Sequence, residues 1–385
     1  MDAFCVACDP PGTRGHVHSR RPVKETIRLM IAPTPRSAEF RSDIHRLRGI
    51  AILMIVAAHC ITFFTWDSHV TSLFLVMDLF DNSTLTFMFI SGFLFHHTSN
   101  EYRYTKYLKT KLRNVIVPYL IAAAPGIAFV LLRDTEQVQA LHLEGSSTIL
   151  RAAYLYVYGG AQLNYALWFI PVLCAYYLSA PLLIQLVRRP KLYASLWLLI
   201  PLSVLMHRPT YSHGHNLSLA LYFLSAFVGG MFCSQFKAQV EPWLDRHVVA
   251  LSVVTVGLIV WHLEFSQHHG KYTTQSLLLF NHKDGWIDWL FVQKALMTLS
   301  LWGCVRRFQA VRLPWLDYLG DVSFTIYFLH LYAIYLLIGM LPNRPAEVTA
   351  IWFILMMSLA VLLPSFVAAC VRRLTPRWSR MLVGS

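Results

Sequence analysis

The sequence predicts an all-α fold: a polytopic bundle of about ten transmembrane helices with both termini in the cytoplasm. Three observations predict it. Of the 385 residues, 56% are hydrophobic and only 14% are charged, whereas about a quarter of the residues in a soluble domain are charged. Long apolar runs recur along the chain, each near the length of a membrane span. Positive charge alternates between the connections that separate these runs.

The apolar runs give one candidate helix each, in chain order. They cover residues 46–66, 82–97, 114–132, 165–187, 193–206, 217–235, 248–264, 286–304, 322–340 and 348–371. Several are shorter than the ~20 residues that cross a bilayer, so we expect tilted, broken or re-entrant helices among them.

The distribution of basic residues sets the orientation, because cytoplasmic connections carry the excess of Lys and Arg. Of the 33 Lys and Arg residues, Lys294 lies inside a run, and the outer connections hold only Arg133, Arg151, Arg208, Lys271, Lys283 and Arg344. The net charge of +13 is therefore a topology signal and an attraction to anionic membrane lipid. No nucleic-acid-binding module is recognisable, so we expect no nucleic-acid partner.

The chain divides into three parts. Residues 1–40 are predicted to be a disordered basic cytoplasmic tail, 41–372 the membrane domain, and 373–385 a short basic cytoplasmic tail. No long apolar run precedes Ile44, so no secretory signal peptide is predicted. Cys5-x-x-Cys8 and His16-x-His18 form only half of a zinc ligand set, and the seven cysteines are scattered. We therefore predict neither a metal site nor a disulfide framework.

The first run carries Arg48 at its start and His59 near its middle. Eleven residues of α-helix turn through about three full turns and rise about 16 Å, so both side chains lie on one helix face. Arg48 is expected near the water and His59 near mid-bilayer. An ionisable group at that depth indicates function, although a histidine bonded to a neighbouring helix is the alternative.

The residues Asp43, Leu47-Arg48-Gly49-Ile50-Ala51-Ile52-Leu53 and His59 resemble the opening helix of the acyltransferase-3 family of integral-membrane O-acyltransferases. The resemblance implies that Arg48 and His59 form the family's catalytic Arg-x10-His signature. It also implies transfer of an acetyl or other short acyl group from cytoplasmic acyl-CoA to a hydroxyl of a cell-surface or exported glycan, in the bacterial inner membrane. The family commonly has Asp and Gly where His45 and Arg46 stand.

The second and third runs continue the resemblance. Residues 89–94, Phe-Ile-Ser-Gly-Phe-Leu, resemble the family's second-helix motif, and Ser91 is a candidate for the substrate cavity; small-residue helix packing is the alternative. Lys109, Lys111 and Arg113 precede the third run and suit the phosphates of acyl-CoA. The positive-inside rule alone also predicts such a cluster. The family usually has two arginines three residues apart, where this chain has Lys111 and Asn114.

Three later residues are further candidates for the substrate cavity. Trp168, in a block that resembles the family, is either a sugar-stacking surface or an interfacial anchor. Lys294 lies midway along the eighth run and either lines the donor site or pairs with Asp288 or Asp78. His330, in the ninth run's family-like block, either lines the cavity of His59 or is satisfied by a neighbouring helix.

The predicted mechanism uses His59 as a general base, since its reference pKa lies near operating pH. Arg48 would bind donor phosphate or stabilise developing negative charge. His59 as a transient acyl carrier is an alternative. Acyl-CoA, and acetyl-CoA in particular, is the expected co-substrate, with no resident cofactor. The expected acceptor is a carbohydrate or lipid-linked glycan.

A polytopic glycan exporter or proton-coupled transporter is the competing function, with the same intramembrane residues as a proton relay. The sequence contains neither repeated halves nor paired Gly/Pro-broken helices, which argues against a transporter. Haem ligation by His59 and His330 is a third alternative.

Overall fold

The computed structural model describes residues 41–385 apart from 67–68, 100–101, 134–138, 140–142, 144, 210–215, 267, 275–284 and 341–348. Ser42–Ser385 form one compact unit. The predicted tail of residues 1–40, with its Cys and His motif, lies outside the described residues.

The all-α prediction is confirmed. In chain order the helices are α2 (Ser42–Cys60), η1 (Ile61–Phe63), α3 (Val70–Phe80), α4 (Thr84–His97), α5 (Tyr104–Lys111), the π-helix η2 (Leu112–Ile116), α6 (Val117–Arg133), α8 (Thr148–Tyr158), η3 (Gln162–Trp168), α9 (Phe169–Leu178), α10 (Ala180–Arg188), η4 (Pro190–Ser195), α11 (Leu196–Met206), α12 (Asn216–Gln235), α13 (Lys237–Phe265), α14 (Trp289–Arg307), α15 (Pro314–Met340), α16 (Ala350–Leu374) and α17 (Ser379–Val383). Within the described residues the strands are only two residues long, and β1 (Arg208–Pro209) pairs in parallel with β2 (Thr273–Thr274).

Among the described residues, seven helical segments are long and apolar enough to cross a membrane, or eight if the bent pair α9 and α10 is one span. Each of the ten predicted runs falls on a helix. The two outside the set of eight are the shorter apolar helix that includes α11, and α14, which carries Lys294 and ends in two arginines. The sequence did not predict α3, α5, α8 or α17, which are short.

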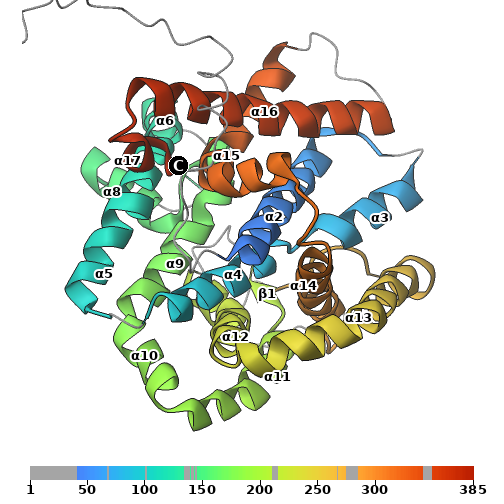
Figure 1. Ribbon diagram of the computed structural model, residues 1–385. Helices are drawn as coiled ribbons and strands as arrows, with labels where there is room; N and C mark the ends of the chain where they lie inside the picture. Colours follow the sequence, from blue (N-terminus) through green and yellow to red (C-terminus); the bar gives the residue numbers. More distant parts are fainter. Residues whose placement is uncertain are drawn as a thin grey trace, which may run out of the picture. The chain divides into compact units, whose positions relative to one another are not determined.

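Helix α2 lies in the interior of the bundle, beside α15 and between α16 and α12 in the view of Figure 1. Glycines allow its close approach to α15. A Cβ atom built on Gly49 would lie 2.7 Å from the carbonyl oxygen of Leu316, and one on Gly320 would lie 2.6 Å from that of His45. This crossing fixes the N-terminal half of α2, where Arg48 stands.

A second close crossing joins α4 to α12. A Cβ atom on Gly92 would lie 1.8 Å from the carbonyl oxygen of Phe227, and one on Gly230 would lie 2.0 Å from that of Phe89. Small residues at helix crossings let backbones pack directly in membranes. Gly92 therefore has the packing role that the sequence offered as the alternative for its motif.

Candidate active site

Two imidazole rings meet inside the bundle. The ring of His59, on α2, lies 5.1 Å from the ring of His330, on α15, measured between centroids. His330 is fully buried. Its Nδ1–H donates to the backbone carbonyls of Ile326 and Tyr327 at 3.1 and 2.9 Å, so the neutral ring has its lone pair on Nε2. That Nε2 atom has no hydrogen-bond partner among the described residues.

Tyr165 is the third member of this cluster. Its hydroxyl lies 3.1 Å from Nδ1 of His59, and the two rings meet edge to face. The segment η3 that carries Tyr165 is anchored to α15 on both sides. Asn164 donates to the carbonyl of Phe328 at 2.8 Å, and the hydroxyl of Tyr327 donates to the carbonyl of Ala166. The His59 ring thus faces protein side chains and is held on one side.

Arg48 is anchored toward the N-terminal end of the same helix. Its guanidinium donates to the carbonyl oxygen of Gly320 through Nε at 3.0 Å and through Nη2 at 2.5 Å, and to Nδ1 of His45 at 3.5 Å. His45 in turn donates through Nε2 to the carbonyl of Asp317 at 2.8 Å. The position where the family commonly has Asp thus holds a histidine that ties α2 to α15.

Arg48 lines a pocket of about 350 Å³, which we call the cation pocket. Its basic side chains are Arg48, Lys111, Arg372 and Arg380, and its acidic side chain is Asp321. Other lining residues include Ser91, Asn114, Tyr107 and Tyr177. Asn114 comes from the π-helix η2, a distortion frequent at functional sites. Basic groups from four helices thus converge on the predicted cytoplasmic side.

The predicted donor residues separate into two groups. Lys111 lines the cation pocket, with its ammonium 5.3 and 5.0 Å from the ring centroids of Tyr107 and Tyr177. Lys109 and Arg113 are exposed and do not line it. The sequence missed Arg372 and Arg380; their only local signal was the basic composition of the C-terminal segment.

The histidine pair does not line the cation pocket. Aromatic rings connect the two regions instead. Phe87, a lining residue of the pocket, contacts Phe169; Phe169 contacts Tyr327; and Tyr327 contacts His330, with ring centroids 6.1, 5.6 and 6.2 Å apart. These side chains form a continuous row of ring contacts from the cation pocket to the imidazoles, and we call them the aromatic series.

Trp168 and Lys294 lie outside the cation pocket. Trp168 is 4% exposed, with its ring stacked on Phe223 at 5.8 Å and the Arg208 guanidinium 5.1 Å from its centroid. Lys294 is fully buried and donates to the backbone carbonyls of Asp78 and Leu79 at 2.8 and 2.6 Å. Asp288 instead caps the start of α14 by accepting from the backbone N–H of Phe291 at 2.7 Å.

Two basic residues of the predicted outer connections, Lys271 and Arg208, lie within electrostatic range of His59. Lys271 also pairs with Asp81 at 3.1 Å. The backbone N–H of Arg208 donates to Tyr272 at 2.8 Å, next to the short β1–β2 pairing. Two predicted outer connections therefore contribute positive charge to the surroundings of His59.

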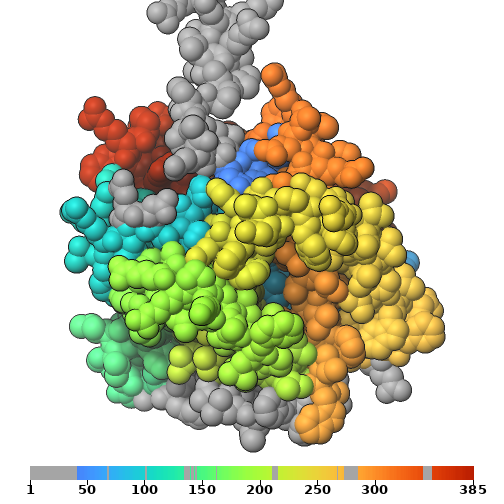
Figure 2. Space-filling view, turned by 60° about the horizontal axis from the view of Figure 1, so that its bottom comes forward, coloured from blue at the N-terminus to red at the C-terminus, as the bar shows by residue number. Residues whose placement is uncertain are grey.

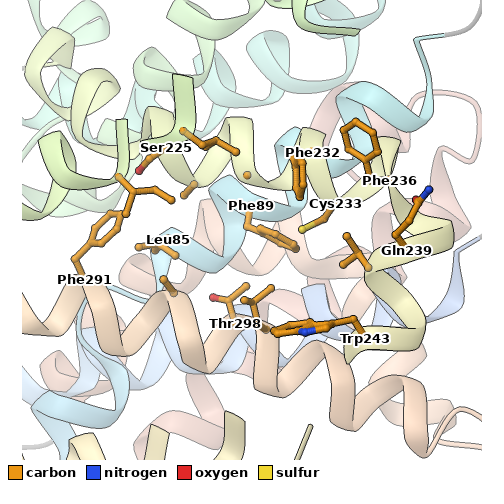
Figure 3. Close-up of a pocket in the computed structure, with 17 residues that line it drawn as sticks. Leu85, Phe89, Ser225, Phe232, Cys233, Phe236, Gln239, Trp243, Phe291 and Thr298 are labelled. Carbon is orange, nitrogen blue, oxygen red and sulfur yellow. The ribbon is translucent and has the colours of Figure 1, made fainter. Parts of the chain in front are cut away.

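A second, larger pocket of about 790 Å³ lies between α11, α12, α13, α14 and α4. Figure 2 shows this face hollowed between α11, α13 and α14. Its lining is almost entirely apolar, with Leu85 and Phe291 toward one end, Phe89 in the middle, and Phe236 and Trp243 toward the other end (Figure 3). Its described lining residues include no acidic, basic or histidine side chain, so they lack the groups that acid–base chemistry requires.

No group of three or more His, Cys, Asp or Glu side chains that could hold a metal ion occurs in the described part of the chain. The predicted outer connections are rich in histidine, at residues 207, 213, 215, 268, 269 and 282, and of these His213, His215 and His282 lie outside the described residues.

The membrane-length helices, with titratable side chains enclosed between them, define a polytopic integral membrane protein with a polar site inside its bundle. The chain belongs to the acyltransferase-3 family: the model of that family's acyltransferase domain matches residues 41–370. It is therefore a membrane acyltransferase, as the sequence predicted. Comparison with curated proteins and with solved structures gave no match.

Proposed function

We propose that this acyltransferase moves an acetyl or other short acyl group from cytoplasmic acyl-CoA to a hydroxyl of a cell-surface or exported carbohydrate, in the bacterial inner membrane. One observation carries the proposal. A single helix, α2, presents Arg48 to the cation pocket and His59 to a second imidazole, about 16 Å further along its axis. Anion binding and proton transfer are thus combined at a fixed separation.

The cation pocket is the proposed site for the donor's phosphates. Arginine binds phosphate through a planar fork of donors, and lysine binds it as a point charge. Acyl-CoA carries its thioester at the end of a pantetheine arm, away from these phosphates. The arm would have to pass the aromatic series at Phe87 to bring the thioester to His59. Donor binding therefore includes movement of these rings.

His59 is the proposed general base. If its Nδ1–H donates to Tyr165, the lone pair lies on Nε2. Nε2 accepts the proton of the acceptor hydroxyl while the hydroxyl oxygen forms a bond to the thioester carbonyl carbon. The carbon–sulfur bond then breaks, and the CoA thiolate takes the proton from His59. The ester is formed and both groups return to their starting protonation states.

The acceptor is proposed to approach from the outer side, where Lys271 and Arg208 lie near His59. A carbohydrate hydroxyl presented there would reach the imidazole pair without crossing the cation pocket. Trp168 is covered by Phe223 and Arg208, so we do not assign it to sugar stacking. Ser91 lines the cation pocket, and its proposed place is on the donor side.

The test uses membrane vesicles that contain the full chain, labelled acetyl-CoA and an extract of envelope glycans. His59→Ala is expected to abolish label transfer and acceptor-dependent thioester consumption while the protein stays inserted and folded. His247→Ala, at a histidine on α13 bonded to its own helix at Trp243, is the matched control and should retain activity. Full transfer by His59→Ala would end the proposal. Glycan movement without thioester consumption would favour the transporter instead.

A further inference from the structure

The family match ends at residue 370, but the cation pocket does not. Arg372 stands in the last turn of α16, beyond the match. Residues 375–385, which include α17 and which we call the C-terminal arm, add Arg380, Gly384 and Ser385 to the lining. In Figure 1 α17 lies beside α6 and the end of α16. Part of the pocket is therefore built from chain outside the family domain.

The C-terminal arm is fixed to the family domain by specific contacts. The hydroxyl of Thr325, on α15, donates to the carbonyl of Val383 at 2.8 Å and lies 2.7 Å from the hydroxyl of Ser385. Between them Gly384 has a φ of 80°, a region that favours glycine. A Cβ atom there would lie 3.0 Å from Phe324. The arm thus has one defined position against α15.

The chain beyond the family match doubles the number of basic side chains in the pocket, with Arg372 from α16 and Arg380 from the C-terminal arm. Arg48 and Lys111 come from within the family match. Asp321 is the one acidic side chain among the described residues of the lining, and the Arg372 guanidinium donates to its backbone carbonyl at 3.0 Å. The lining carries an excess of positive charge that matches a ligand with several phosphate charges.

We propose that Arg372 and Arg380 bind phosphate groups of the acyl-CoA donor, and that the C-terminal arm is a donor-binding element of this protein. The inference rests on the proposed function, because it takes acyl-CoA as the ligand. These arginines act on donor affinity. Both arginines line the cation pocket, which the histidine pair does not line, and they take no part in proton transfer.

The test compares arginines of one segment in the full-length protein, purified in lipid nanodiscs. Arg372→Gln and Arg380→Gln each remove a basic group from the pocket. Arg373→Gln and Arg377→Gln remove exposed arginines of the same segment that do not line it. The probe is coenzyme A itself, titrated calorimetrically, with dephospho-coenzyme A as a second probe. Steady-state rates with acetyl-CoA give kcat and KM for each variant.

Loss of one charge-assisted phosphate contact is expected to weaken coenzyme A binding about tenfold. KM for acetyl-CoA should rise by a similar factor for Arg372→Gln and Arg380→Gln, with kcat unchanged, while the two control variants match the wild type. If the coenzyme A affinities of all four variants equal the wild type, the inference fails and the proposed function stands. If the wild type binds no coenzyme A, the acyl-CoA donor fails and the inference with it.

Discussion

The rings of His59 and His330 lie 5.1 Å apart, although they belong to the first and ninth predicted helices. His330 is oriented by its own helix, because its Nδ1–H donates to two backbone carbonyls. His59 is oriented from another direction, by the hydroxyl of Tyr165. Two imidazoles with separately fixed orientations can pass a proton between a substrate and a second acceptor.

His330→Gln is expected to lower kcat by about 10²-fold, at the low end of the range for loss of an acid–base group, because the buried Nε2 acceptor is removed. KM for acyl-CoA should not change. The measurement is steady-state transfer in vesicles. His262→Gln is the control, since His262 is also buried but bonds to Gln293, away from the pair. Unchanged kcat in His330→Gln would make His330 a structural histidine.

Lys111→Gln is expected to raise KM for acyl-CoA about fivefold to tenfold, because it removes one pocket cation from a phosphate contact worth about 1–1.4 kcal/mol. Lys109→Gln and Arg113→Gln should have little effect, since both side chains are exposed outside the pocket. Titration of acyl-CoA in initial-rate assays distinguishes the three. Equal effects from all three would show that the basic cluster attracts the donor through its combined positive charge and not through a contact of Lys111.

Gly92→Ala is expected to destabilise the protein by at least 1–3 kcal/mol, roughly the cost of overpacking a core. The added Cβ atom would lie 1.8 Å from the Phe227 carbonyl oxygen, so α4 and α12 must separate. The midpoint of thermal unfolding in detergent measures the effect. Gly257→Ala is the matched control, because a Cβ there meets nothing within 4 Å. A wild-type midpoint for Gly92→Ala would refute the close crossing.

Lys294→Met is expected to lower stability, because it leaves the carbonyl of Leu79 without its side-chain donor and the carbonyl of Asp78 with Gln293 alone. Each unsatisfied buried group costs roughly 1–3 kcal/mol. KM for acyl-CoA should stay at the wild-type value, since Lys294 does not line the cation pocket. Thermal unfolding and initial rates test both parts. A raised KM with unchanged stability would restore Lys294 to the donor site.

The sequence offered Arg48, His59 and His330 as candidates and missed Tyr165 and Arg380, whose places depend on how distant segments meet. Helical periodicity placed Arg48 and His59 on one face of α2. It could not show that Tyr165 would reach His59, because that contact depends on the kink at Asn164 inside η3. Arg380 was equally invisible, since only the docking of the C-terminal arm on Thr325 brings it to the pocket.

For the fold, too, the sequence predicted what composition marks and missed what depends on contacts between distant segments. Apolar runs located each of the ten predicted helices, because burial in lipid imposes a strong compositional signal. The short helices α3, α5, α8 and α17 escaped. Helix α5 is polar, α17 has five residues, and α3 and α8 have 11 residues each, too few for a span alone. The close α2–α15 and α4–α12 crossings rest on glycines whose partners are distant in sequence.

The aromatic series formed by Phe87, Phe169 and Tyr327 also has a consequence for the proton gradient across the membrane. A continuous wet passage between cytoplasm and exterior would let protons run down their gradient. Rings packed in a row between the two regions would block such a proton leak while no donor is bound. Rings that part only around a threaded donor arm would let a covalent group be handed across an energised bilayer without dissipating the potential that the cell maintains.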